Sequence, residues 1–200
     1  MLDIHLILAS ASPRRRALLD QLGVRYSCDP AQLDEAQRIG ENAPDYVQRM
    51  AREKALAVAA RYPAHAFAVL AADTTVVIDN TVLGKPRDRE DALDMLARLS
   101  GRRHVVLTAV CLHTAAGTHR ELVATEVEFT ALSSAMCDAY VATGEPWDKA
   151  GAYAIQGLGG AFVRAIQGSY SNVVGLPLCE TWQLLRANGI ATALTPAALA

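Results

Sequence analysis

The segment from Phe67 to Ile78 constrains the fold more than any other, because nearly all of its residues are apolar or β-branched. Such a run is typical of a buried β-strand. Asp79-Asn80 then predicts a turn, and Val82-Leu83 predicts the returning arm of a hairpin. The chain must therefore fold around a β-sheet that contains this segment.

Start and stop signals predict helices both before and after this strand in the sequence. Ser12 and Pro13 form an N-cap followed by a proline at the first helical position, and Gly23 ends that helix. Asp88 is the expected N-cap of a later helix, which Gly101 ends. The expected helices cover residues 12–23, 44–61, 88–101, 133–144 and 177–189.

Short apolar segments between these helices predict the remaining strands, over residues 4–8, 24–28, 105–113 and 122–129. The last two should form a hairpin, and the glycine-rich stretch 151–175 is expected to form short strands and tight turns. Helices alternate with single strands and hairpins, so we expect an α/β (mixed α+β) fold on a mixed sheet. The length of 200 residues suits one large domain or two tightly joined lobes, and we expect a single domain, residues 1–200.

Composition excludes disorder and several classes of partner. Hydrophobic residues make up 52% of the chain and charged residues 20%, which is enough to bury a sizeable core. The net charge of −2 comes from 19 basic and 21 acidic residues, so we expect no bulk binding of nucleic acid or of an anionic membrane surface. The sequence has no apolar stretch of the roughly 18 residues that a membrane span needs.

The cysteines and the N-terminal segment predict a cytoplasmic protein. The four cysteines are far apart, without a C-x-x-C pair or a zinc-like cluster, so we expect reduced thiols. Asp3 precedes the first short apolar run and the basic residues 14–16 follow it, which is the reverse of the order in a signal peptide. The cysteines are Cys28, Cys111, Cys137 and Cys179.

The turn from Ser10 to Arg15 joins the first expected strand to the first expected helix and is built mainly of small residues before two arginines. Backbone N–H groups at a helix N-terminus carry partial positive charge and suit a phosphate. Arg14 and Arg15 oppose the helix dipole there unless an anion is bound. The segment is therefore either a phosphate cradle or a capped helix with solvated arginines.

Lys54 and Asp73 are polar residues in apolar patterns. Lys54 lies on the same helical stripe as Val47 and Met50, so its side chain either extends to the rim or points into a lined cavity. Asp73 interrupts the buried strand, and an unpaired buried carboxylate is energetically costly. Asp73 needs a cation, a metal or a place at the mouth of the strand; the alternative is a structural, hydrogen-bonded aspartate.

Three further polar residues complete the candidate set. Lys85 stands between a glycine and a proline, Glu35 lies in a polar loop, and Gln156 interrupts a glycine-rich apolar run. A glutamine offers both a donor and an acceptor and can hydrogen-bond to the edge of a small ligand. The alternative for Lys85 is a solvated turn lysine, and the alternative for Gln156 is a side chain bonded to the backbone. Together the candidates suit a nucleotide phosphate with a divalent cation, while the P-loop and G-x-G-x-x-G patterns are absent.

These residues fall within motifs through which nearly the whole chain resembles the Maf family of nucleoside triphosphate pyrophosphatases. The motifs are Ser10-Ala11-Ser12-Pro13-Arg14-Arg15, Asp34-Glu35, Arg52-Glu53-Lys54-Ala55, Ala72-Asp73-Thr74, Gly84-Lys85-Pro86, Asp148-Lys149-Ala150-Gly151-Ala152-Tyr153 with Ile155-Gln156-Gly157, and Ser171-Asn172-Val173-Val174-Gly175-Leu176-Pro177. The resemblance implies an elongated mixed α/β fold, ITPase-like, in which a mixed sheet is flanked by helices and two lobes surround a central cleft. It also implies a protein that is often a homodimer.

The resemblance further implies hydrolysis of a nucleoside triphosphate to the monophosphate and pyrophosphate with a divalent metal cation. It places Asp73 as the catalytic carboxylate, and Arg14, Thr74 and Gln156 at positions tied to substrate choice. The methylated-GTP branch of the family usually has an acidic residue where this chain has Gln156. The chain is therefore similar to the dTTP/UTP branch, and we expect dTTP and UTP as substrates, with modified pyrimidine nucleotides as further candidates.

The expected mechanism is attack of water on the α-phosphorus, assisted by Mg²⁺ or Mn²⁺. Asp73 and Glu35 are the expected metal ligands, and the sequence leaves open which of them is the base. Lys54 and Lys85 are the expected catalytic cations. Ser10, Arg14, Arg15, Thr74 and Gln156 are expected to bind the substrate.

Two other interpretations stay open. The first is the same reaction on a modified purine nucleotide, such as a methylated GTP. The second is a non-catalytic nucleotide- or nucleic-acid-binding regulator of cell division and septum formation, as the family's filamentation-related name suggests. Product release with metal, and its loss with a chelator, would separate an enzyme from a binding protein.

Overall fold

The computed structural model describes residues 4–63 and 67–196. The chain divides into two compact units, each described by itself. Unit 1 comprises Met1–Asp73, Thr108–Val123 and Gly175–Ala200, and unit 2 comprises Thr74–Leu107 and Ala124–Val174. Three long strands contribute residues to both units, so the division cuts across the sheet rather than between two stretches of sequence.

The described residues form a seven-stranded mixed sheet of order β2-β1-β3-β5-β6-β7, with β4 paired to β3. β1 is parallel to β2 and to β3, whereas β3–β4 and β6–β7 are antiparallel. This arrangement confirms the expected mixed α/β class. The strands are β1 His5–Leu8, β2 Tyr26–Cys28, β3 Phe67–Ile78, β4 Thr81–Leu83, β5 Arg103–Thr114, β6 Gly117–Phe129 and β7 Val163–Gln167.

Three of the helices begin where the sequence places their caps. Ser12, Asp88 and Ser133 each accept a hydrogen bond from the backbone N–H three residues later. The α-helices are α1 Pro13–Gln21, α2 Ala43–Ala59, α3 Arg89–Leu99, α4 Ser134–Ala142, α5 Tyr170–Val174 and α6 Leu178–Ala187. The 3₁₀ helices are η1 Glu145–Asp148, η2 Ala150–Ala152 and η3 Leu158–Phe162.

Two sequence expectations need correction. The sequence predicts short strands and tight turns for the stretch 151–175, but the structure has mainly helical turns there: the end of η2, all of η3 and α5, with β7 as its strand. The second strand of the long hairpin begins at Gly117 rather than near Leu122. The first half of β6 is largely exposed and carries polar side chains, so no apolar pattern marks it as a strand.

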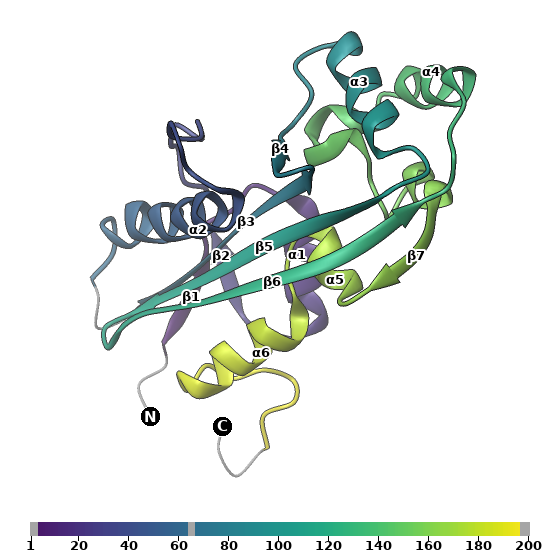
Figure 1. Cartoon of the computed structure of the whole chain (residues 1–200). Coiled ribbons are helices and arrows are strands. Elements are labelled where there is room, and N and C mark those ends of the chain that lie inside the picture. Colours follow the sequence, from purple (N-terminus) through teal and green to yellow (C-terminus); the bar gives the residue numbers. More distant parts are fainter. Residues whose placement is uncertain (1–3, 64–66, 197–200) are drawn as a thin grey trace. The chain divides into compact units, whose positions relative to one another are not determined.

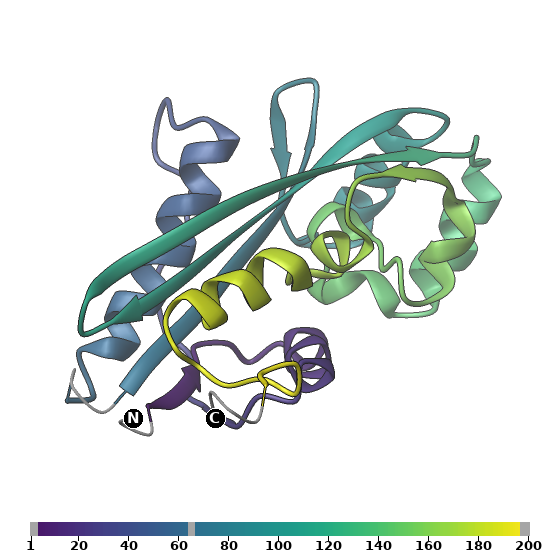
Figure 2. The same cartoon turned by 90° about the horizontal axis from the view of Figure 1, so that it is seen from below.

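In unit 1, two crossovers place helices on both faces of the strands. The chain runs from β1 through α1 to β2, and from β2 through α2 to β3 on the other side of β1. Right-handed crossovers in opposite directions put α1 and α2 on opposite faces. Figures 1 and 2 show α2 on one face of these strands and α6 on the other. The stripe of α2 that contains Val47, Met50 and Val58 is fully buried.

Unit 2 has its own hydrophobic core, in which aromatic rings meet edge to face. The ring of Phe129 lies 4.8 Å from that of Tyr153, and the ring of Tyr140 lies 4.9 Å from that of Phe162. Apolar side chains of α3 and α4 pack into the same cluster. The β3–β4 turn has positive φ at Asp79 (50°) and Asn80 (58°), as a two-residue hairpin turn requires.

Across residues 4–63 and 67–196, no helix combines the length and the apolar character needed to cross a membrane.

Candidate active site

The candidate residues of unit 1 gather where the strand order reverses. β1 has β2 on one side and β3 on the other, so the chain leaves β1 in one direction and returns on the opposite side. In open α/β sheets, ligands bind at the carboxyl ends of the strands at such a switch point. The Ala9 N–H donates to the carbonyl of Leu70 across this point (2.8 Å). Ser10 follows β1 directly, and Asp73 lies a few residues along β3.

Lys54 joins two carboxylates at this point. Its Nζ lies 2.7 Å from Oδ1 of Asp73 and 2.6 Å from Oε1 of Glu35. Lys54 and Asp73 are only 8% and 7% exposed, while the Glu35 side chain is half exposed. Lys54 therefore does not extend to a solvated rim, and Asp73 has the cationic partner that a buried carboxylate needs. The structure brings together three candidates that are far apart in the sequence.

Burial dominates the electrostatics of Asp73. Loss of water raises the pKa of its carboxyl group above the ordinary value, and the nearby charges of Lys54 and Arg15 oppose that rise without cancelling it. The Glu35 carboxylate adds to the rise. Asp73 is thus a desolvated carboxyl group with cations on hand, an environment typical of functional sites.

The turn after β1 is a second part of this group of residues. Oγ of Ser10 accepts from the Ser12 N–H (3.2 Å) and from Nη1 of Arg15 (3.4 Å). Nε of Arg15 donates to the carbonyl of Gly175 (2.8 Å). Burial lowers the pKa of the Arg15 guanidinium, partly offset by the charge of Asp73. Arg15 is therefore not a freely solvated arginine, and it links Ser10 to the Gly175 backbone.

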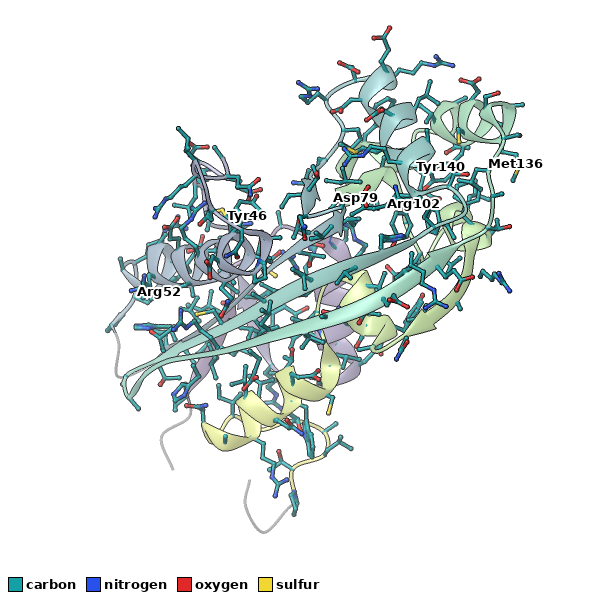
Figure 3. The ribbon with its side chains drawn as sticks, viewed as in Figure 1. Tyr46, Arg52, Asp79, Arg102, Met136 and Tyr140 are labelled. Carbon is teal, nitrogen blue, oxygen red and sulfur yellow. The ribbon has the colours of Figure 1, made fainter. Side chains whose placement is uncertain are left out.

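The loop that carries Glu35 is fastened to α2 by two residues that the sequence analysis missed. Tyr46 Oη donates to the Glu35 carbonyl (2.9 Å), and Arg49 Nη2 donates to the Ala36 carbonyl (3.1 Å). Figure 3 labels Tyr46 on α2, and burial together with the Asp73 and Glu35 charges raises its pKa to about 12. Neither residue interrupts an apolar pattern, so no local sequence signal marks them.

The remaining candidates, Thr74, Lys85 and Gln156, belong to unit 2. Thr74 directly follows Asp73 in β3 and is partly buried. Lys85 is exposed, and its neighbour Gly84 accepts a hydrogen bond from the Gly151 N–H (3.0 Å). Gln156 is exposed on a turn closed by a hydrogen bond from the Gly157 N–H to the Ala154 carbonyl (3.2 Å). Arg14 lies in the first turn of α1 in unit 1 and is partly buried.

The donor set near Lys54 fits a magnesium-like ion bound together with its substrate. Within the described ranges, no cluster of three or more histidine, cysteine, aspartate or glutamate residues could hold a metal alone. Asp73 and Glu35 nevertheless contact the same ammonium group. Mg²⁺ is commonly held by one or two carboxylates, with water and substrate phosphates completing its shell. The residues therefore fit such an ion.

The fold and the site together indicate a class of protein. A buried carboxylate paired with lysine at the switch point of an α/β sheet, beside a helix N-terminus, is typical of proteins that bind a small anionic ligand. The chain belongs to the Maf-like protein family, which matches residues 5–188.

Curated relatives cover nearly the whole chain. A dTTP/UTP pyrophosphatase of Anaeromyxobacter sp. (strain Fw109-5) is 57% identical over 190 residues, covering 92% of this chain and 90% of the relative. One from Anaeromyxobacter dehalogenans (strain 2CP-C) is 58% identical over 189 residues, covering 92% and 94%. One from Methylobacillus flagellatus is 52% identical over 187 residues, covering 94% of each.

Solved structures give more distant matches. A nucleoside-triphosphatase / dITP/XTP pyrophosphatase of Mycobacterium abscessus is 18% identical with a TM-score of 0.42, covering 64% of this chain and 76% of that protein. The Ham1 protein of Staphylococcus aureus is 12% identical with a TM-score of 0.43, covering 62% and 71%.

Proposed function

We propose that this protein hydrolyses dTTP and UTP to the monophosphate and pyrophosphate. The observation that carries the proposal is the buried Asp73 carboxylate held against Lys54 beside Glu35. The relatives named dTTP/UTP pyrophosphatase support the choice of substrate, since they are 50–58% identical. Modified pyrimidine nucleotides are further candidate substrates.

In this proposal the chain binds phosphate and positions a water molecule. Asp73 accepts a hydrogen bond from the attacking water, or its proton, and orients it toward the α-phosphorus. Lys54 keeps Asp73 and Glu35 in place when the substrate is absent and offers positive charge to the phosphates when it is bound. Ser10, Arg14, Arg15 and Lys85 supply hydrogen bonds and charge to the triphosphate.

Asp73 and Glu35 would hold a divalent cation, Mg²⁺ or Mn²⁺. When bound, such an ion supplies neutralisation of the phosphate charge and activation of the attacked phosphorus. Two carboxylate ligands leave room for the phosphate and water oxygens that such an ion prefers.

Thr74 and Gln156 are the residues that we propose for base selection. A thymine or uracil edge presents two carbonyl acceptors around one N–H donor. The Gln156 amide can donate to a carbonyl and accept from that N–H. A carboxylate at this position could only accept, which suits a donor-rich guanine edge better.

The decisive test is a nucleotide panel with product analysis. The purified protein would be given UTP, CTP, dTTP, dATP, dGTP and a methylated GTP, with Mg²⁺, Mn²⁺ or a chelator. We expect UMP and dTMP with pyrophosphate, and no products with the chelator. In ¹⁸O-water, the label should enter the monophosphate if water attacks the α-phosphorus.

The outcomes separate the competing functions. Preference for the methylated GTP would favour the purine interpretation, and nucleotide binding without products would favour a regulatory binding protein.

The variant Asp73→Asn keeps the shape of the side chain but removes its charge, so turnover should fall about 100-fold or more. If that variant keeps more than about a tenth of the wild-type kcat, Asp73 is not the catalytic carboxylate.

We also propose that residues 1–200 act as one catalytic domain in the cytoplasm, as a homodimer without bulk nucleic-acid binding. The four cysteines are free thiols, which suits a reducing compartment. The net charge of −2 gives no general attraction to nucleic acid. Light scattering during size exclusion would give the oligomeric state, and a filter-binding assay at low salt would test for nucleic acid.

A further inference from the structure

The carboxylate of Glu145 in unit 2 ends on backbone amides rather than on a cation. Its Oε2 accepts from the Leu158 N–H (3.0 Å) and its Oε1 accepts from the Gly159 N–H (3.0 Å). These amides begin η3, and the residue before them, Gly157, provides no side-chain cap. Amides in the first turn of a helix lack partners within the helix and favour a negative charge. Glu145 therefore caps η3 from a different element, η1.

Tyr140 extends this contact to the other end of the same segment. Its Oη donates to Oε1 of Glu145 (2.7 Å) and accepts from the Ala154 N–H (3.1 Å). Tyr140, labelled in Figure 3, is only 4% exposed, and its ring packs edge to face on Phe162. Backbone amides at positions 154, 158 and 159 are thus held by one tyrosine–glutamate pair.

The glycines of this segment allow it to wrap closely around the pair. A Cβ at Gly157 would overlap the Glu145 carboxylate, and a Cβ at Gly159 would come within 2.7 Å of Tyr140 Oη. These approaches are too close for a side chain at Gly157 unless Glu145 moves, and for one at Gly159 unless both Tyr140 and the Ala154 backbone move. The pair and the glycines therefore form one fitted arrangement.

Gln156 lies on the turn that this arrangement holds. The turn is closed by a hydrogen bond from the Gly157 N–H to the Ala154 carbonyl, and Gln156 is exposed at its tip. Because the Gln156 side chain is exposed, its place depends mainly on the backbone of the turn that carries it. The position of its backbone is therefore set by the groups that hold the two ends of the turn.

We propose that Glu145 and Tyr140 are positioning residues for base selection, acting through the turn that presents Gln156. The inference rests on the proposed function, since it assigns to that reaction two residues that do not contact the substrate. Glu145 is suited to the role as a permanent charge. Burial would raise its pKa, but hydrogen bonds from the Gly159 amide, Tyr140 and the Leu158 amide outweigh burial and hold the pKa below its usual range.

A purely structural cap would behave differently from a positioning residue. Loss of a structural cap lowers stability and reduces activity toward every nucleotide alike. Loss of a positioning residue changes the ratio of kcat/KM between nucleotides, and does so only while Gln156 is present. A double-mutant cycle between Glu145 and Gln156 measures this dependence.

The experiment compares the wild type with Glu145→Gln, Gln156→Ala and the double variant, using UTP and dGTP. Glu145→Gln keeps the side-chain shape but turns an amide group toward one backbone N–H. The matched control is Glu126→Gln, which removes a unit 2 carboxylate paired with Arg103 at the surface. Circular dichroism and thermal melting check folding, and Tyr140→Phe gives a second variant that keeps the buried ring.

We expect Glu145→Gln and Tyr140→Phe to lower kcat/KM for UTP about tenfold, mainly through KM. The ratio of kcat/KM for UTP to kcat/KM for dGTP should therefore decrease. Glu126→Gln should leave kcat/KM for UTP and the UTP-to-dGTP ratio of kcat/KM unchanged. In the Gln156→Ala background, Glu145→Gln should change the ratio little. Equal effects of Glu145→Gln in the two backgrounds, or an unchanged ratio, would overturn the inference while leaving the proposed function intact. A folded wild type without pyrophosphatase activity would overturn the proposed function, and the inference with it.

Discussion

At the scale of single residues, Lys54 decides whether Asp73 can stay buried as a carboxylate. The ammonium group contacts both Asp73 and Glu35, and the Lys54–Asp73 pair is almost wholly buried. Desolvation of such a pair costs about as much as its attraction returns, so the pair itself adds little stability. Removing Lys54 alone is different, because Asp73 then remains buried without the cation to which it is hydrogen-bonded.

We predict that Lys54→Met lowers the free energy of unfolding by about 3 kcal/mol and abolishes turnover. Adding Asp73→Asn should restore most of the lost stability but none of the activity. Chemical denaturation of the wild type, both single variants and the double variant measures the cycle. Wild-type stability in Lys54→Met would mean that Asp73 does not depend on this lysine for its charge.

A second residue prediction concerns Gln156. We expect Gln156→Glu to lower kcat/KM for UTP by one to two orders of magnitude, because an unpaired polar partner costs about 1–3 kcal/mol. Remaining activity should still yield UMP and pyrophosphate. Steady-state kinetics with UTP, dTTP and dGTP measures the change, and equal UTP efficiency in both proteins would remove Gln156 from base selection.

At the scale of elements, α2 organises the polar loop before it as well as the core beneath it. Glu41 accepts from Nε and Nη2 of Arg49 at 2.6 and 2.7 Å, and this pairing lowers the pKa of Glu41 to about 2. Arg49 also reaches the Ala36 carbonyl. The buried face of α2 supplies Lys54, while its partly exposed face holds the loop that carries Glu35.

We predict that Arg49→Lys loosens this loop, because a lysine cannot form the forked contact with Glu41. Amide hydrogen exchange over residues 34–41 should become faster, and kcat should fall several-fold with little change in melting temperature. Arg52→Lys is the matched control, since Arg52 is exposed on the same helix. If both variants exchange like the wild type, Arg49 does not hold the loop.

At the scale of the whole molecule, a buried histidine links stability to pH. His104 in the unit 2 core is 2% exposed, with Nε2 2.9 Å from Tyr153 Oη. Burial lowers its pKa from 6.5 to about 4. The unfolded chain therefore binds a proton between these values that the folded chain does not, so stability falls as pH drops from about 6.5 toward about 4.

We predict that the wild type loses up to roughly 3 kcal/mol from this residue across that window. His104→Gln cannot titrate and can still hydrogen-bond to Tyr153, so its free energy of unfolding should depend less on pH. Urea denaturation between pH 7 and pH 4 compares the two proteins. Parallel curves over that range would show that His104 does not cause the acid sensitivity.

The sequence by itself determined the features that depend on neighbouring residues. The caps at Ser12, Asp88 and Ser133 bond to amides three residues away, so their helices begin where predicted. The run from Phe67 to Ile78 forms β3 as expected, because apolar β-branched residues suit a buried strand wherever the sheet places it. Lys54, Asp73 and Gln156 also stand out locally, as polar side chains in apolar patterns, whereas Thr74 is a candidate only through the family resemblance.

Only the tertiary structure decided which of those residues meet. Lys54 contacts Asp73 and Glu35 because α2 lies in the connection between β2 and β3, which packs it against the sheet. No local sequence pattern predicts the path of that connection. The stretch 151–175 forms helical segments, and Glu145, from another element, caps one of them, η3. Its glycines allow the close approach of that carboxylate. Local sequence fixes backbone preferences of a few residues, whereas contacts between distant segments depend on how the whole sheet brings them together.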